Sequence, residues 1–275
     1  MNRTKLLINT ITLSSATAIS QAVSILFLPL ILSFYSTEEY GIFFYLVSMV
    51  TLILPLATGR YELALVTEKS EKSSAILLGS LITISSISTL FFTSILIFAY
   101  FLDFAILTKF SMLLAFPALL WGSIQSQLIL HQLNRTAEFK IIAIMRLAAT
   151  ILKLSSQLWF GWIGGFGAWG LIIGLFVEYF IHVAFLVYRY KEHFWKCMFV
   201  FPDGGRALLV KYVQYPRFIL SSSFLARASN ELPILVITNV FGLDISGLFS
   251  LARRLLDLPS QLISESISKV FFKFA

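Results

Sequence analysis

The sequence predicts an all-α protein that crosses a membrane with about eight helices. This prediction rests on composition, on the length of the apolar runs and on the positions of the positive charges. Of the 275 residues, 58% are hydrophobic and 13% are charged, whereas an ordinary soluble domain has roughly 45–50% apolar and about 25% charged residues. Together with a mean hydropathy of +0.86, this composition excludes a soluble globular domain and a disordered chain. The expected class is a polytopic integral membrane protein.

The apolar runs are long enough to form membrane-spanning helices. About 20 mostly apolar residues, each adding 1.5 Å, are needed to cross the hydrocarbon core of a bilayer. Eight segments meet this requirement: Leu6–Phe34, Tyr40–Val66, Ser74–Leu102, Phe110–Leu133, Ala137–Trp162, Phe166–Tyr188, Phe218–Val240 and Ser246–Phe272. The eighth is the least regular, because Arg253, Arg254, Asp257 and Glu265 interrupt it.

The Lys and Arg residues outside these segments predict an orientation. With the N-terminus in the cytoplasm, only Lys109 falls on the external side. The cytoplasmic set is Arg3, Lys5, Lys69, Lys72, Arg135, Lys140, Arg189, Lys191, Lys196, Arg206, Lys211, Lys269 and Lys273. Cytoplasmic loops of membrane proteins are enriched in Lys and Arg, so we expect a multi-pass protein with a cytoplasmic N-terminus. The same distribution accounts for the net charge of +7, and we expect no nucleic-acid partner.

The chain divides into two predicted bundles. The longest loop, Tyr190 to Tyr215, mixes aromatic and basic residues, which suits a membrane surface. We therefore expect a six-helix lobe over residues 1–190, a cytoplasmic loop over 191–215, and two helices of a second lobe over 216–275. A weak internal repeat supports this division: Leu28-Pro29, Tyr40-Gly41-Ile42-Phe43 and Leu54-Pro55 correspond to Leu232-Pro233, Ser246-Gly247-Leu248-Phe249 and Leu258-Pro259. Repeated halves are typical of secondary transporters.

Motifs of enzymes and metal sites are absent from the sequence. There is no G-x-x-x-x-G-K-[ST] phosphate loop, so we expect no ATP hydrolysis. The three histidines, His131, His182 and His193, lack the spacing of a metal site. Glu178 and His182 lie four residues apart in the sixth predicted span, which favours a polar contact between helices over a ligand pair. We expect a protein that is not an enzyme and that uses no cofactor.

Charged side chains inside the predicted spans are the best candidates for a functional site, because each is costly to place in a bilayer. Arg146 and Lys153 are seven residues apart on the fifth span and share a face, which Gln157 continues. Glu178 adds a carboxylate on the sixth span. These residues are either cavity residues or structural ion pairs between helices.

The last two spans each carry a charged i, i+4 pair. Arg227 and Glu231 form the first pair, and Arg253 and Asp257 form the second. The deep set is therefore Arg146, Lys153, Arg227, Arg253 and Arg254 against Glu178, Glu231 and Asp257, and five positive minus three negative charges leaves +2. This balance favours an anionic cargo.

The first predicted span carries an uncharged polar stripe. Its members recur at spacings of four and three residues and are Thr10, Ser14, Thr17, Gln21 and Ser24. They either line an aqueous path or allow helices to pack closely. Arg60 and Glu62 lie near the predicted cytoplasmic end of the second span, where snorkelling to the interface explains them as well as function does.

Several short motifs, taken in order, suggest a family. They are Tyr40-Gly41-Ile42-Phe43, Ala57-Thr58-Gly59-Arg60-Tyr61-Glu62, Tyr215-Pro216-Arg217-Phe218, Gly247-Leu248-Phe249-Ser250-Leu251-Ala252-Arg253-Arg254 and Ile263-Ser264-Glu265-Ser266-Ile267-Ser268-Lys269-Val270-Phe271-Phe272. As a set they resemble the polysaccharide-transport (O-antigen flippase-like) branch of the multidrug/oligosaccharidyl-lipid/polysaccharide (MOP) exporter superfamily. By position, Arg60 and Arg253 match motifs of that family.

The resemblance implies two helical lobes around a central cavity that opens alternately to each side, as in MATE-like exporters. It implies a flippase that carries an undecaprenyl-pyrophosphate-linked oligosaccharide across the bacterial inner membrane in polysaccharide, O-antigen or lipopolysaccharide biosynthesis. The implied partners are this lipid-linked oligosaccharide and the lipid bilayer, with a polysaccharide polymerase or glycosyltransferases as further partners. A cationic cavity suits the pyrophosphate.

The resemblance also raises expectations about completeness and alternatives. Similar proteins have twelve or more helices, so the chain is expected to be a truncated or split copy with an incomplete second lobe. One alternative function is a non-transporting membrane scaffold in a polysaccharide assembly complex. Another is a cation-coupled drug exporter of the same superfamily, which the net positive charge of the deep set disfavours.

Overall fold

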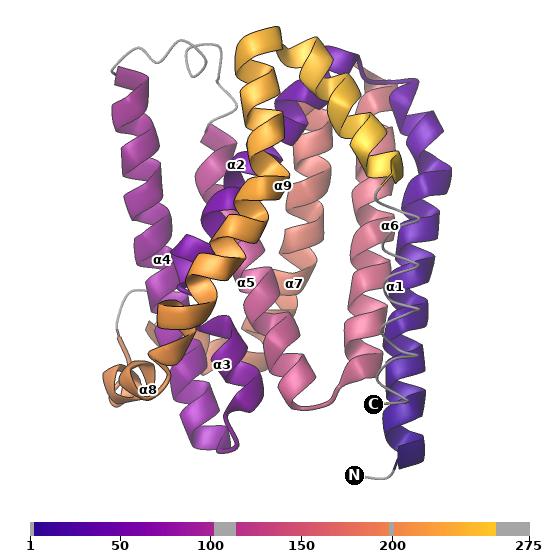
Figure 1. The fold of residues 1–275 in the computed structure, drawn as a ribbon. Helices are drawn as coiled ribbons and strands as arrows, with labels where there is room; N and C mark the ends of the chain where they lie inside the picture. Colours follow the sequence, from indigo (N-terminus) through magenta and orange to yellow (C-terminus); the bar gives the residue numbers. More distant parts are fainter. Residues whose placement is uncertain (1–2, 102–113, 198–200, 257–275) are drawn as a thin grey trace.

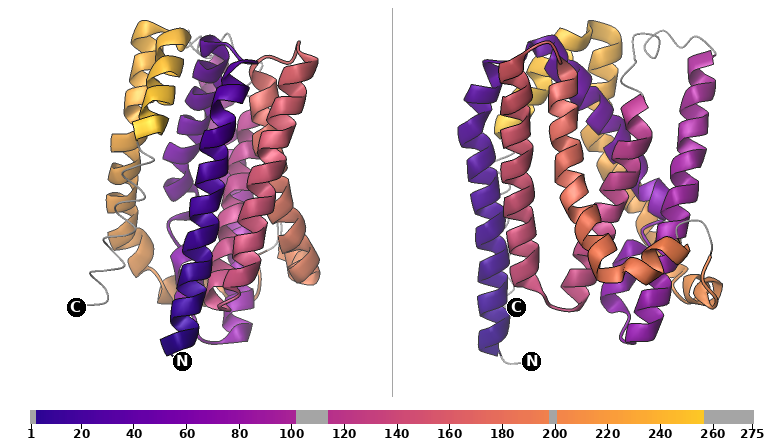
Figure 2. Two further views of the ribbon diagram at one scale, coloured as in Figure 1. Left: turned by 90° about the vertical axis from the view of Figure 1, so that its right-hand side faces the viewer. Right: turned by 180° about the vertical axis from the view of Figure 1, so that it is seen from behind.

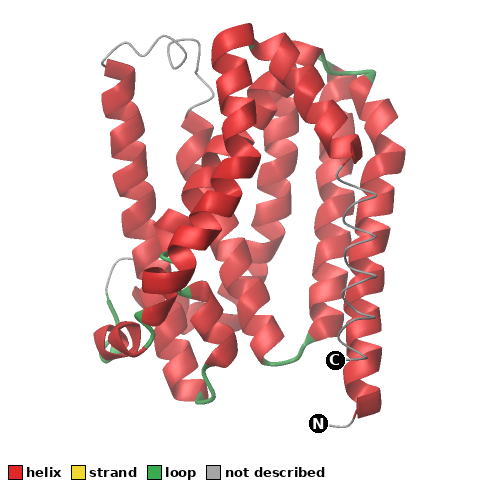
Figure 3. Cartoon of the chain, in the orientation of Figure 1, coloured by secondary structure: helices red, strands yellow, loops and turns green. Residues whose placement is uncertain are grey.

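The computed structural model describes residues 3–101, 114–197 and 201–256. Within these ranges the chain forms helices and no strands (Figure 3). The helices are α1 (Arg3–Leu32), α2 (Thr37–Thr58), α3 (Glu62–Thr67), α4 (Glu71–Phe101), α5 (Ala115–Arg135), α6 (Phe139–Ile163), α7 (Ala168–Cys197), α8 (Gly205–Lys211) and α9 (Leu220–Phe241). A π-helical turn, η2 (Tyr215–Ile219), leads into α9, and residues 243–256 are helical. The predicted all-α class is confirmed.

Five of the described helices are long and apolar enough to cross a membrane. They are contained in Ser15–Leu32, Thr37–Thr58, Glu71–Phe101, Phe139–Ile163 and Ala168–Lys191. The helices α5 and α9 are similarly long, with 21 and 22 residues, but more polar. The helix α5 can be more polar because it lies at the centre of the bundle, where it contacts other helices instead of lipid. The chain is a membrane protein.

The long helices form a bundle with α5 at its centre (Figure 1). The helix α5 contacts α2, α3, α4, α6 and α7, while α1 packs along α6 at one edge. Phe116, Leu120, Ile124 and Leu128 of α5 are fully buried and form the middle of the apolar core. Such buried side chains pack closely and hold the helices together through many small van der Waals contacts.

The first predicted lobe and the start of the second are packed together. The helix α9 contacts α2 and crosses the front of the bundle in Figure 1, and Figure 2 shows the same arrangement from the side and from behind. The connections α3–α4 and α5–α6 lie at the end of the bundle where the N-terminus lies, as does α8 (Figure 1). Most of the Lys and Arg residues in the loops lie at this end. The sequence likewise predicts that most of them lie on one side of the membrane.

The second predicted span is broken in the structure. A capping box at Ser36 and Glu39 starts α2, with Ser36 Oγ accepting from Glu39 N and Glu39 Oε2 accepting from Ser36 N. The helix ends at Gly59, which has φ +59°, and Arg60 also has a positive φ of 61°. Since left-handed backbone ends a helix, the expected continuous segment Tyr40–Val66 is wrong and is replaced by α2 and the short α3.

The predicted loop over 191–215 is largely helical. The helix α7 changes direction at Tyr190 (φ −125°, ψ 32°) and continues to Cys197, whose carbonyl accepts a hydrogen bond from Thr83 Oγ1 of α4. The helix α8 also packs on α4. Packing against α4 therefore gives this segment a structure that its mixed composition does not reveal.

The repeated glycines of the sequence meet in the fold. A Cβ on Gly41 would lie 2.0 Å from the carbonyl oxygen of Leu243, and a Cβ on Gly247 would lie 2.0 Å from the carbonyl oxygen of Thr37. Each glycine thus faces the residue four positions before the other glycine, a reciprocal contact. Thr37 Oγ1 also donates to Asp244 Oδ1 at 2.8 Å. The two copies of the repeat pack backbone against backbone at the start of α2.

Candidate functional site

A cavity of about 590 Å³ lies within the bundle. Its walls come from α1, α2, α5, α6, α7, α9 and the helical residues 243–256. The lining residues are Thr17, Ser20, Gln21, Ser24, Ile25, Leu28, Phe44, Val47, Ser48, Ser126, Leu130, Arg146, Thr150, Glu178, His182, Glu231, Ile234, Ser250, Arg253 and Arg254. Thr17 lies near the middle of α1, about 20 Å from either helix end at 1.5 Å per residue. The cavity is therefore deep in the bundle.

Five charged residues line this cavity. Arg146, Arg253 and Arg254 contribute three positive charges, and Glu178 and Glu231 contribute two negative charges. Three minus two leaves a formal charge of +1. The lining is therefore cationic, and Lys153, which pairs with Glu178 from outside the lining, raises the balance to four minus two, or +2.

The side chain of Arg146 is held in place by a hydrogen bond that does not neutralise its charge. Its Nη1 donates a hydrogen bond to the hydroxyl oxygen of Thr17 on α1 at 3.0 Å. A hydroxyl fixes the guanidinium group but carries no opposite charge. In the part of the chain that the structure describes, Arg146 forms no ion pair. Its positive charge is available to a ligand in the cavity.

Lys153 behaves differently from Arg146, although the two share one helix face. Lys153 Nζ lies 2.5 Å from Glu178 Oε2, and both side chains are mostly buried. This ion pair links α6 to α7 and neutralises Lys153. Gln157 is also structural, because its carbonyl accepts from Tyr35 Oη at 2.6 Å and its Nε2 donates to Leu171 O at 3.1 Å. Of the three residues predicted to share this face, only Arg146 lines the cavity. Lys153 and Gln157 form contacts between helices instead.

Arg253 connects two walls of the cavity. Its Nη1 donates to the backbone carbonyl of Asn230 on α9, and its Nη2 donates to Asn230 Oδ1 at 3.1 Å. Arg254 also lines the cavity. Arg253 therefore combines a structural contact with a place in the cavity lining, next to Arg254.

Buried polar atoms without a protein partner point to a polar occupant. The hydroxyl of Ser250 is buried and makes no hydrogen bond within the described residues, and the residue is 3% exposed. Ser20 Oγ, in the α1 part of the lining, is likewise buried and has no partner among the described residues. Leaving a buried polar group unsatisfied costs about 1–3 kcal/mol. A ligand with hydrogen-bonding groups, or water, would satisfy these atoms.

The predicted site residues fall into three groups in the structure. Five of them line the cavity, namely Arg146, Arg253, Arg254, Glu178 and Glu231. Lys153 does not line it but forms an ion pair with Glu178, which does. Arg60 and Arg227 do not line it. Asp257 lies outside the described residues.

The two arginines that do not line the cavity have clear positions. Arg60 occupies the break between α2 and α3 and pairs with the buried Glu62, its Nη1 lying 3.0 Å from Glu62 Oε1. Arg227 is exposed on α9 and forms no ion pair with Glu231. The expected Arg227–Glu231 pair is therefore wrong, because only Glu231 turns toward the cavity.

The polar stripe of the first helix is confirmed where it is described. Thr17, Gln21 and Ser24 all line the cavity, together with Ser20, which the stripe had not included. The side chains of Thr10 and Ser14 lie outside the described residues. Sequence reasoning also missed His182 as a cavity residue, although its position four residues after Glu178 places both on one helix face.

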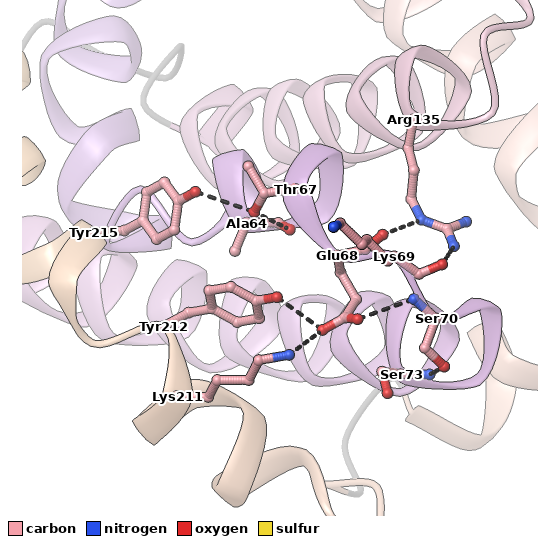
Figure 4. Close-up of polar contacts among 10 residues, drawn as sticks. All are labelled: Ala64, Thr67, Glu68, Lys69, Ser70, Ser73, Arg135, Lys211, Tyr212 and Tyr215. Carbon is pink, nitrogen blue, oxygen red and sulfur yellow. Dashed lines mark hydrogen bonds and ion pairs between the residues drawn. The ribbon is translucent and has the colours of Figure 1, made fainter. Parts of the chain in front are cut away.

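A polar cluster at the end of the bundle was also missed (Figure 4). Glu68, between α3 and α4, accepts hydrogen bonds from Lys211 Nζ at 2.8 Å, Ser70 N at 3.0 Å and Tyr212 Oη at 2.8 Å. These donors lower the pKa of Glu68 to about 2, and the pairing raises the pKa of Lys211. The cluster fastens the segment before α9 to the α3–α4 connection, and its partners are too far apart in sequence to be recognised there.

No metal site is found among the described residues, which hold no group of three or more His, Cys, Asp or Glu side chains arranged for a metal ion.

Comparison with protein families gives the context of this cavity. A family model described as polysaccharide biosynthesis protein matches residues 31–274. The chain belongs to this family. The match starts at the end of α1 and includes every cavity residue of this polysaccharide biosynthesis protein from α2 onward. No curated protein and no solved structure gives a match to the chain.

Proposed function

We propose that the protein is a flippase that carries a lipid-linked oligosaccharide, joined to its lipid through pyrophosphate, across a bacterial inner membrane. The observation that carries this proposal is the deep cavity whose Arg146 is positioned by Thr17 and forms no ion pair with any residue that the structure describes. Membership of the polysaccharide biosynthesis family supports a cargo of this class.

The arginines suit the pyrophosphate of the cargo. Guanidinium groups bind phosphate oxygens in a bidentate way, and this interaction is strong where water is scarce. Arg146, Arg253 and Arg254 come from two separate parts of the fold, α6 and residues 243–256. An anion held between them would also hold these parts together.

The uncharged part of the cavity suits sugars. Hydroxyl and amide side chains of Thr17, Ser20, Gln21, Ser24 and Ser48 line it, together with Ser126. Sugar hydroxyls both donate and accept hydrogen bonds, as do these groups. The buried hydroxyl of Ser250, which has no hydrogen-bond partner within the described residues, would gain one from such a cargo.

We further propose that transport involves no covalent chemistry, that the N-terminus lies in the cytoplasm, and that polymerases or glycosyltransferases supply or consume the cargo. The positive charge of the cavity favours this proposal over a drug exporter for cationic compounds. A scaffold without transport would not need a cavity with an uncompensated arginine.

The test is binding of undecaprenyl-pyrophosphate-linked oligosaccharide to the purified protein, with Arg146→Gln as the variant. We expect the affinity to fall by about tenfold or more, since hydrogen bonds to charged groups contribute about 1.5–3 kcal/mol. The matched control is Arg227→Gln, which removes an exposed arginine outside the cavity and should leave binding unchanged. Equal binding by Arg146→Gln and wild type would refute the cavity assignment. Binding without transport in proteoliposomes would favour the scaffold.

A further inference from the structure

A second cavity, of about 550 Å³, lies at the end of the bundle where the N-terminus lies. Its lining residues are Glu71, Ala75, Gln132, Arg135, Thr136, Tyr188, Arg189, Tyr190 and Lys191. Three helices meet there at the limits of their apolar segments, since α4 begins at Glu71, α5 ends at Arg135 and the apolar part of α7 ends at Lys191. The cavity is therefore at the level of a membrane surface.

Two backbone carbonyls hold Arg135 in this cavity (Figure 4), and it forms no ion pair in the ranges that the structure describes. Its Nε donates to the carbonyl of Glu68 at 2.8 Å, and its Nη2 donates to the carbonyl of Lys69 at 3.3 Å. Backbone carbonyls orient the guanidinium group but bring no negative charge. A guanidinium group has five N–H donors, so these two contacts leave three for a ligand.

Gln132 places a further donor on the cavity wall. The residue is buried, and its Oε1 accepts a hydrogen bond from Ser74 Oγ at 2.9 Å. Because the oxygen of the amide is engaged by Ser74, a ligand meets its NH₂ group. Gln132 and Arg135, three residues apart on one helix, together form a set of donors for an anion.

The charge of the cavity matches a single negative charge. Arg135, Arg189 and Lys191 are basic and Glu71 is acidic, while Arg189 is paired with Glu138 at 3.0 Å outside the lining. Three positive charges minus two negative charges leaves +1, and a phosphodiester carries −1.

Two tyrosines strengthen the match to a lipid. Tyr188 is 84% exposed, and Tyr190 lines the same cavity. Aromatic side chains with a polar group are enriched at the level of the headgroups of a bilayer.

We propose that this cavity binds the headgroup of an anionic phospholipid. Its phosphodiester would accept hydrogen bonds from Arg135 and Gln132 and would pair with Lys191, while its acyl chains would follow the apolar segments of α4 and α7. Basic cavities between membrane helices bind anionic headgroups for the same reasons. The proposal is independent of the cargo of the central cavity.

The test is equilibrium binding of dioleoylphosphatidylglycerol to the purified full chain in detergent, compared with dioleoylphosphatidylcholine. We expect the anionic lipid to bind and the zwitterionic lipid to bind at least tenfold more weakly. Lys191→Gln removes an exposed lysine and should weaken binding about fivefold, the effect of one basic residue at a membrane surface. The matched control, Lys140→Gln, removes an exposed lysine at the same end that does not line the cavity, and should leave binding within about twofold of wild type.

Three results would overturn the proposal. Equal binding of the two lipids would show that the net negative charge of the headgroup is not recognised. Equal weakening by Lys140→Gln and Lys191→Gln would show a general effect of surface charge. Competition by inorganic phosphate at the lipid's own concentration would show a site for free phosphate. Arg135→Gln is a second variant that should abolish binding, and Lys191→Gln keeps the test valid if Arg135→Gln does not fold.

Discussion

The reciprocal contact of Gly41 and Gly247 predicts a specific pattern of stability. In Gly41→Ala the new Cβ would meet the carbonyl oxygen of Leu243 at 2.0 Å, whereas an ordinary contact needs about 3.4 Å. The two segments must therefore move apart by about 1.4 Å. The hydrogen bond from Thr37 to Asp244, now 2.8 Å, would lengthen to about 4.2 Å and be lost.

The size of the effect follows from overpacking. Inserting a methyl group into a packed contact costs about 1–3 kcal/mol, which corresponds to a fall in the melting temperature of roughly 2–12 °C for a chain of this size. Gly247→Ala should cost about the same, because its Cβ meets Thr37 O at the same distance. The assay is thermal unfolding of the purified variants in one detergent, at one heating rate.

The double variant gives the decisive result. A single separation of the two segments relieves both clashes, so Gly41→Ala/Gly247→Ala should cost clearly less than the sum of the single variants. The control is Gly122→Ala, where the new Cβ would meet the side chain of Tyr179 at 3.1 Å and needs a shift of only a few tenths of an ångström. Additive costs, or a larger loss in Gly122→Ala than in Gly41→Ala, would refute the reciprocal contact.

Two further predictions concern charged groups. The folded-state pKa of Glu68, about 2, is below its ordinary value of 4.5, so its stabilising contribution is present above pH 4.5 and is lost as the pH falls toward 2. Glu68→Gln should therefore lower the melting temperature at pH 7 and have little effect near pH 2. Lys153→Met should destabilise the protein more than the double variant Lys153→Met/Glu178→Gln, because the single variant leaves a mostly buried carboxylate without its partner.

Melting temperatures in detergent measure both predictions. For Glu68, a loss in Glu68→Gln that is constant from pH 7 to pH 2 would contradict the assigned pKa. For the ion pair, a double variant less stable than Lys153→Met would show that Lys153 and Glu178 do not act together.

The sequence by itself determined the class of the protein and most helix positions. Long apolar runs leave a chain no alternative to helices in a bilayer, because every backbone N–H and C=O must be paired within the segment. The polar stripe of α1 and the deep charges Arg146, Arg253 and Glu178 also followed from the sequence. Each is costly in lipid, so its presence in an apolar run already indicates a cavity or a partner.

Only the tertiary structure decided which of these charged groups remain available to a ligand in the cavity. Arg146 and Lys153 share one face of the same helix, yet the first contacts a hydroxyl on α1 and the second a carboxylate on α7. The facing residue on a neighbouring helix determines this difference, and helix periodicity contains no information about neighbours. The same holds for Glu68 and Lys211, 143 residues apart, and for the second cavity, whose walls come from three helices. The sequence determines where along the helices the charged residues lie, whereas the packing of the helices determines which groups these residues contact.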